Sequence, residues 1–200
     1  MSRIRPTPAL WRRATFARLP AALLALAVTS ANVQAQGLPQ TQIVPDTSGH
    51  GGRVRASILI PATPAIVWAV MKDCENAPRF VPNLRACVIE STSRDGSSDI
   101  RRHSIAWLAG FPPVSIRFAS RYKAGQEIQF ERISGDITQM TGKWVLEPRN
   151  NGASTLLTYD AYLVPSRLLP SGLVRSALRR DTPRILEAVR REAIARSSAP

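Results

Sequence analysis

The sequence predicts an α+β fold in which an antiparallel sheet is covered by one long C-terminal helix. Three observations indicate this fold. Most of the chain after residue 83 alternates between apolar and polar residues, short turn sequences separate the alternating segments, and residues 171–196 have apolar residues at helical spacing. An open sheet has an apolar face to bury, and the C-terminal helix is the one long amphipathic element left to cover it.

Residues 1–35 have the pattern of an export signal. They hold five arginines and no acidic residue, and a mostly apolar run extends from Leu19 to Ala31. This run is shorter than the roughly 20 residues that span a bilayer, and small residues follow it. We therefore expect cleavage after Ala35 and a mature protein in the periplasm. The alternative is an uncleaved N-terminal anchor.

The mature chain is expected to begin with a tether and continue as one domain. Residues 36–52 are polar, rich in Gly, Pro, Ser and Thr, and without periodicity, which predicts a flexible tether. The domain is expected to cover residues 53–196. Its first segment, residues 53–60, alternates between basic or polar residues and apolar ones, which predicts a half-buried strand.

Three segments predict helices. Thr63 and Pro64 form a helix start, as the N-cap and the first helical residue, and apolar residues follow at helical spacing. Residues 73–80 predict a second short helical turn. The C-terminal helix is expected over residues 171–196, with a kink or a new start at Pro183, because proline has no amide hydrogen to donate.

The remaining segments predict strands that follow one another in an antiparallel meander. Turn sequences such as Asn150-Asn151-Gly152 separate them. Together with residues 53–60 they make a sheet of about seven strands, with the two short helices inserted after the first strand. These six strands are expected at residues 84–91, 100–108, 114–122, 127–133, 139–147 and 154–164.

Charge and cysteine content limit the chemistry. The formal net charge is +13, from 27 Lys and Arg residues against 14 Asp and Glu residues. We do not expect a nucleic-acid partner, because the chain has an export pattern and no basic strip with interleaved aromatic residues. Two cysteines and two histidines without clustered carboxylates argue against a Cys/His zinc site, so no metal or cofactor is expected. In an oxidising compartment Cys74 and Cys87 are either bridged or two small buried thiols.

Several stretches of the sequence resemble one protein family. Residues 61–68 (PATPAIVW) and 73–83 (DCENAPRFVPN) resemble the opening of the polyketide cyclase/dehydrase and coenzyme Q-binding family. Residues 142–148 (GKWVLEP) and 155–159 (TLLTY) are similar to its late strand pair. This family belongs to the START/Bet v 1-like (SRPBCC) helix-grip superfamily. The likeness extends from about residue 54 to residue 192 and follows the order of elements derived above.

The resemblance implies a curved sheet wrapped on the C-terminal helix, with a cavity between them for a lipid, quinone or polyketide. We therefore predict an exported protein that binds or carries such a hydrophobic molecule. A cyclase or dehydratase is the alternative, and a domain with a filled core that binds a protein partner is a third, weaker hypothesis. Arg132 shares the inner face and is expected to meet a polar head group or to lie at the cavity rim. The ligand-binding candidates are Ile116, Phe118, Tyr122, Ile128, Phe130, Arg132, Met140, Trp144, Leu157 and Tyr159.

Catalysis is the second functional hypothesis. A cyclase or dehydratase acting on a bound polyketide-like substrate would use His103 with Tyr122 or Tyr159 as acid and base. We favour binding without covalent chemistry, because the spacing of the residues implies no pair of nucleophile and base.

Two features suggest contact with an anionic membrane surface. The apolar hairpin tip at residues 107–113 contains Trp107, Leu108 and Phe111, which we expect to gate the cavity or to enter a lipid surface. Packing of this tip against the C-terminal helix is the alternative. The C-terminal helix is rich in arginine, which suits an anionic lipid surface, although a solvated helix face explains the same pattern.

Overall fold

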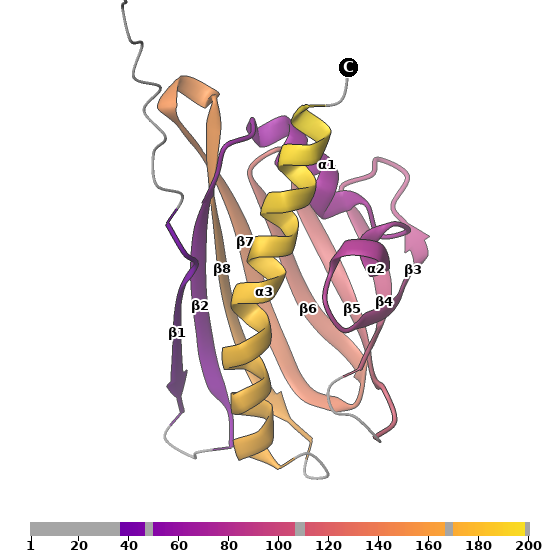
Figure 1. Ribbon diagram of the computed structural model, residues 1–200. Helices are drawn as coiled ribbons and strands as arrows, with labels where there is room; N and C mark the ends of the chain where they lie inside the picture. Colours follow the sequence, from indigo (N-terminus) through magenta and orange to yellow (C-terminus); the bar gives the residue numbers. More distant parts are fainter. Residues whose placement is uncertain (1–36, 47–49, 107–110, 167–169, 199–200) are drawn as a thin grey trace, which may run out of the picture. The chain divides into compact units, whose positions relative to one another are not determined.

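The computed structural model describes residues 37–46, 50–106, 111–166 and 170–198 (Figure 1). In this part of the chain, eight strands form one antiparallel sheet in the order β1-β2-β8-β7-β6-β5-β4-β3. Strands β3 to β8 are a meander, and β2 joins it beside β8. The strands are β1 (Gln40–Pro45), β2 (Gly52–Ile60), β3 (Leu84–Thr92), β4 (Ser98–Ile105), β5 (Val114–Lys123), β6 (Glu127–Gly135), β7 (Ile137–Arg149) and β8 (Ser154–Pro165).

Within the described segments, three α-helices accompany the sheet: α1 (Pro64–Lys72), α2 (Ala77–Phe80) and α3 (Ser171–Ser197). Figure 1 shows α3 running along one face of the sheet, with α1 and α2 on the same side. A short 3₁₀ turn (Asn150–Gly152) links β7 and β8. The predicted α+β class, with a long C-terminal helix on an antiparallel sheet and two short helices after the first long strand, is confirmed.

Strand β1 lies inside the segment that the sequence predicts to be a flexible tether. It pairs with β2 in antiparallel register, with Ile43 opposite Val54, so the sheet has one strand more than expected. An edge strand is held mainly by backbone hydrogen bonds to its neighbour, and these need no apolar pattern in the added strand. The polar composition of residues 36–52 therefore concealed the strand.

Helix α3 continues through Pro183 without a new start. Proline removes one backbone hydrogen bond of the helix, but the residues around it are held by packing. Thr182 and Leu186, on either side of Pro183, are both buried. The new start that the sequence allowed at Pro183 therefore does not occur, because tertiary contacts outweigh the local preference of proline.

The core has two parts on the inner face of the sheet. One lies where α1 and the C-terminal part of α3 pack on β2 and β8, around Ile58, Leu157 and Val189. The other is formed mainly by β5 to β8 and includes Phe118 and Phe130. The first part is filled by helix side chains. The second part borders the cavity described next.

Candidate ligand cavity

A cavity of about 340 Å³ lies between the inner face of the sheet, the segment from α1 to β3, and α3. Its volume is within the range of small-molecule sites, and its lining is mostly apolar, as is usual for such sites. Alternation along β5 to β8 turns the same face of each strand toward it. Seven of the predicted ligand-binding residues line it: Ile116, Phe118, Ile128, Phe130, Met140, Trp144 and Tyr159.

The opposite wall comes from helical segments that sequence reasoning did not assign to the site. Leu178, Thr182, Ile185 and Val189 of α3 line the cavity. They recur at the spacing of one helix face, a signal that was present in the sequence but could also mean simple core packing. The segment from the end of α1 to the start of β3 adds Met71, Cys74, Ala77, Val81, Pro82 and Leu84.

Three predicted ligand-binding residues are not part of the cavity lining. Leu157 is fully buried in the core under α3. The Arg132 guanidinium donates a hydrogen bond to the Gly135 carbonyl, 3.1 Å away, in the turn after β6. The Tyr122 hydroxyl donates to Asp99. The inward face was right for Leu157 and Tyr122, but alternation fixes only the face of a strand, and not the position of the cavity along it.

Strand β4 contributes a charged pair at the cavity wall. The Arg101 Nε atom lies 3.1 and 3.0 Å from the two carboxylate oxygens of Asp99, and both side chains are more than nine-tenths buried. A terminal nitrogen of Arg101 also donates to the Lys72 carbonyl at 3.4 Å. Arg101 lines the cavity. Its guanidinium is paired with Asp99 and still has further N–H groups that can donate hydrogen bonds into the cavity.

Tyr122 and Lys72 lie next to the Asp99–Arg101 pair on the inner face of the sheet. The Lys72 Nζ atom lies 3.2 Å above the centre of the Tyr122 ring, and the ring edge meets Trp68 of α1. Burial and the hydrogen bond to Asp99 raise the pKa of Tyr122 to about 12. Burial lowers the pKa of Lys72. The Tyr122 phenol is therefore protonated at neutral pH and donates its hydrogen bond to Asp99.

His103 lies on the cavity wall next to Arg101 along the inner face of β4. Its ring meets the Phe118 ring edge to face, with the ring centres 4.8 Å apart. Burial, followed by the charge of Arg101, lowers the pKa of His103 to about 4. The imidazole is therefore neutral at neutral pH and offers one donor and one acceptor nitrogen.

The sulfur atoms of Cys74 and Cys87 form a disulfide beside His103. The Cα atoms are 5.3 Å apart, and the bridge joins the segment between α1 and α2 to β3. Closing a loop of this length stabilises a fold by about 3 kcal/mol in the chain-entropy view. The Cys87 Sγ atom lies 3.1 Å from the His103 Nε2 atom. Cysteine and histidine are ligands for soft and borderline metal ions. Among the described residues, Cys74, Cys87 and His103 are the group whose ligand atoms lie close enough together to hold such an ion.

Tyr159 supplies a polar group at the centre of the inner face. Its ring contacts Trp144, with the ring centres 4.3 Å apart, and stacks against Phe130. Burial raises the pKa of Tyr159 far above its usual value, so the hydroxyl remains a donor. Among the described residues, this hydroxyl has no hydrogen-bond partner.

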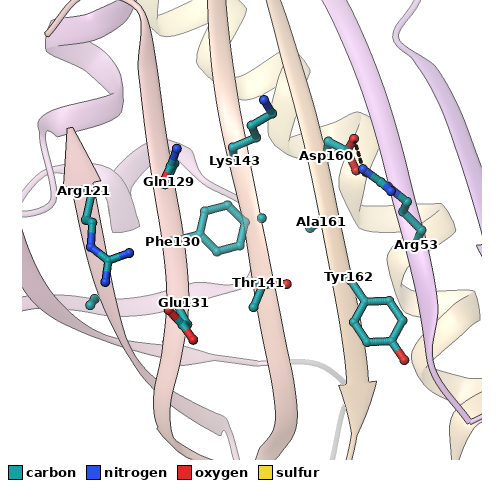
Figure 2. A pocket seen from close by; sticks show the side chains of 12 residues that line it. Arg53, Arg121, Gln129, Phe130, Glu131, Thr141, Lys143, Asp160, Ala161 and Tyr162 are labelled. Carbon is teal, nitrogen blue, oxygen red and sulfur yellow. Dashed lines mark hydrogen bonds and ion pairs between the residues drawn. The ribbon is translucent and has the colours of Figure 1, made fainter. Parts of the chain in front are cut away.

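A second hollow, of about 380 Å³, lies on the outer face of the sheet (Figure 2). Polar and charged side chains such as Arg121, Glu131 and Thr141 surround it. Figure 2 shows Asp160 bound to Arg53, whose nitrogens lie 2.6 Å from the carboxylate oxygens. The inner cavity is the better candidate for a hydrophobic ligand, because its wall is mostly apolar.

The predicted membrane or gate loop falls largely outside the described residues. Trp107 and Leu108 are not described, and Phe111 is 57% exposed. Within the described part of the chain, none of the helices combines the length and the hydropathy needed to cross a bilayer.

Comparisons with solved structures identify the same fold. The Zhui aromatase/cyclase from Streptomyces sp. R1128 superimposes with a TM-score of 0.65 at 17% identity, covering 75% of this chain and 98% of that one. A START superfamily protein from Mycobacterium smegmatis has a TM-score of 0.63 at 19% identity, covering 72% and 97%. The STAR-related lipid transfer protein from Xanthomonas axonopodis has a TM-score of 0.59 at 16% identity, covering 77% and 98%.

At these identities the structural matches establish the fold alone. Among curated proteins, none matches the sequence. The family model described as polyketide cyclase / dehydrase and lipid transport matches residues 60–190, which is more than half of the chain. This match covers α1, the inner cavity wall and most of α3. The chain therefore belongs to the polyketide cyclase/dehydrase and lipid transport family.

Proposed function

We propose that this protein is an exported carrier or binding protein for a lipid-, quinone- or polyketide-like molecule. The observation that supports this most directly is the cavity of about 340 Å³ between the sheet and α3. Its wall is apolar apart from a few polar groups, which is the arrangement that holds a hydrophobic molecule and fixes its orientation. The family match, which includes lipid transport, is consistent with this role.

The polar groups in the wall suggest a ligand with a polar end. Arg101 is held in place by Asp99, and its remaining N–H groups are free to bind an oxygen. Tyr159 adds a hydroxyl without a protein partner among the described residues. A ligand with a carboxylate, phosphate or carbonyl oxygen would satisfy these donors, and charge-assisted bonds of this kind are stronger than neutral ones.

Export to the periplasm is part of the proposal. It rests on the signal-like pattern of residues 1–35 and agrees with the disulfide between Cys74 and Cys87, because disulfides persist in oxidising compartments. Measuring the N-terminus of the protein recovered from a periplasmic extract tests it. Processing after Ala35 is the expected result, and an intact N-terminus in the cytoplasmic fraction would contradict it.

Ligand binding is tested by native mass spectrometry of the exported protein, followed by organic extraction. We expect a co-purifying hydrophobic molecule at about one per chain. Two variants of neighbouring residues on β7 provide a matched pair, because Met140 lines the cavity and Thr141 borders the outer hollow. Met140→Trp should abolish the bound mass and Thr141→Trp should retain it. The reverse pattern would place the ligand on the outer face, and a ligand-free protein that takes up nothing from total lipid extract would refute the proposal.

An enzymatic role has one specific observation in its favour. His103 and Tyr159 both line the cavity, while Tyr122 is occupied by Asp99. A cyclase or dehydratase using His103 and Tyr159 would lose turnover of a polyketide-like substrate in His103→Ala while keeping affinity for it. Unchanged turnover in His103→Ala would rule out this pair.

Membrane contact is the second part of the carrier hypothesis. The arginines of α3 and the exposed Phe111 ring suit an anionic lipid surface. Phe111→Asp should weaken sedimentation with vesicles that contain phosphatidylglycerol. Unchanged sedimentation would argue against insertion of this loop.

A further inference from the structure

We propose that reduction of the Cys74–Cys87 disulfide creates a site for Zn²⁺ on the cavity wall, with the two cysteine sulfurs and the His103 Nε2 atom as ligands. The two cysteines and two histidines of the sequence argued against a site of this kind. The fold nevertheless brings three ligand atoms together, all within 4.8 Å of one another. The proposal does not depend on which molecule occupies the cavity.

Two of the three ligands are fixed by the sheet. Cys87 on β3 and His103 on β4 are directly opposite each other in the antiparallel register. Residues paired in this way have their Cβ atoms about 5 Å apart on one face of the sheet, which lets their side chains converge on one ion. The distance of 3.1 Å between Cys87 Sγ and His103 Nε2 shows that they already converge.

The third ligand comes from the segment between the two short helices. Cys74 is 3% exposed, and its backbone is anchored by hydrogen bonds from its own amide to the Lys72 carbonyl at 2.9 Å and from the Ala77 amide to its carbonyl at 3.3 Å. A tetrahedral zinc ion holds sulfur at about 2.3 Å and nitrogen at about 2.0–2.1 Å, so its ligand atoms are roughly 3.4–3.8 Å apart. The reduced sulfurs reach this separation by rotating their side chains.

The charges around the site fit a dithiolate zinc centre. Two thiolates and one Zn²⁺ carry no net charge, so the occupied site can face an apolar cavity without an uncompensated ion. Two carboxylates of neighbouring segments are already used, because Asp73 accepts hydrogen bonds from Asn76 and Arg196, and Asp99 is held by Arg101. Among the described residues the site thus has three protein ligands. Zinc sites with three protein ligands keep a fourth position open for water or for a ligand.

Formation of the site requires a dithiol reductant. The dithiol transfers two electrons and two protons to the bridge, the S–S bond breaks, and the dithiol closes to its own disulfide. Zn²⁺ then displaces the two thiol protons, which are released to solvent. The oxidised protein has no free thiolate and is expected not to bind the ion at this place.

The test uses Co²⁺ as a spectroscopic substitute for Zn²⁺ in the purified, exported protein under anaerobic conditions. After reduction and removal of the reductant, we expect one Co²⁺ per chain, thiolate-to-cobalt charge-transfer absorbance and tetrahedral d–d bands, all removed by one equivalent of Zn²⁺. The protein that keeps its disulfide should show none of these bands. Absence of the bands in the reduced protein, confirmed to be folded by circular dichroism, would overturn the proposal.

Variants separate this site from metal binding by thiols alone. His103→Gln retains both cysteines and their ability to form the bridge, and it should weaken Co²⁺ binding at least about tenfold. His50→Gln is the matched control, because His50 is exposed and does not line the cavity. Cys74→Ser and Cys87→Ser should each abolish the charge-transfer band. Equal Co²⁺ affinity in His103→Gln and His50→Gln would refute the assignment of His103 as a ligand.

Discussion

The buried pair of Asp99 and Arg101 can be tested by removing one charge at a time. In Arg101→Met the Asp99 carboxylate, in a residue that is 3% exposed, loses its hydrogen-bonded cation and keeps the Tyr122 hydroxyl and the nearby charge of Lys72. Leaving one member of a buried ion pair uncompensated costs about 3–5 kcal/mol. Solvent screens this pair little, because the side chains of Arg101 and Asp99 are only 8% and 2% exposed.

The double variant Asp99→Asn/Arg101→Met shows whether this loss belongs to the pair. The amide oxygen introduced by Asp99→Asn would still accept the Tyr122 hydrogen bond, while neither buried charge would remain. We expect the double variant to be more stable than the sum of the single variants predicts, with a coupling energy of about 2–3 kcal/mol. The single variants lose stability for the same reason, an unpaired buried charge, and the double variant removes that reason.

Equilibrium unfolding in urea, followed by tryptophan fluorescence with the disulfide intact, measures these differences. For a domain of this size, a loss of 3–5 kcal/mol shifts the midpoint by about 1–2 M urea. Arg102→Met is the matched control, because Arg102 is the next residue on β4 and its exposed side chain pairs with Glu90 on the outer face. It should cost less than about 1 kcal/mol.

Two results would refute this account of the cavity wall. Single variants whose effects add within about 0.5 kcal/mol in the double variant would show that Asp99 and Arg101 are not coupled. A loss in Arg102→Met as large as in Arg101→Met would show that arginine is required on β4 for a reason other than burial. Either result would also remove the argument that Asp99 holds Arg101 in place for a ligand.

Three further predictions concern single side chains. Gly142→Ala places a methyl group 2.6 Å from the Phe130 ring and from a β8 carbonyl, so it should lower thermal stability by about 1–3 kcal/mol, measured by calorimetry. Hydrogen bonds from Arg53 outweigh burial and lower the pKa of Asp160. The stability that wild type gains over Asp160→Asn should therefore be complete at pH 6 and shrink as the pH falls below about 4. A pH-independent difference between the urea midpoints of the two proteins would contradict this. Tyr159→Phe should weaken binding of anilinonaphthalene sulfonate about 2–12-fold, the worth of one hydrogen bond, with the urea midpoint unchanged.

Much of the fold could be predicted from the sequence because most strands bury one face. Along β5, Val114, Ile116 and Phe118 are buried while the residues between them are more exposed, and this alternation identifies both the strand and its inner face. Strand β1 could not be found in the same way, because it is an edge strand with a polar sequence. Strand β1 is held by pairing with the backbone edge of β2, and the sequence of residues 36–52 gives no local sign of this pairing.

The cavity was harder to predict than the fold because its boundary depends on contacts between distant segments. Leu157 and Tyr159 occupy equivalent inward positions on β8, but α3 covers the first and leaves the second open to the cavity. Cys74 approaches His103 only because the segment before α2 folds back onto β3. Sequence spacing carries no information about either arrangement, so the alternation rule gave the inner face correctly and the cavity lining only in part.

Strand β4 explains why the polar groups of the cavity were the least predictable. Its inner face carries Asp99, Arg101 and His103 in succession, and its outer face is partly polar as well, so the strand has little apolar alternation from which its orientation could be inferred. Polar residues are kept inside a sheet only when other groups satisfy them, and here Tyr122 and the Asp99–Arg101 pair do so. A strand that departs from the hydrophobic pattern while remaining buried is where a specific site is expected, because such a departure costs stability. Strand β4 lines the cavity with Arg101 and His103. The absence of apolar alternation along this buried strand therefore supports the proposal that this part of the cavity binds a polar group.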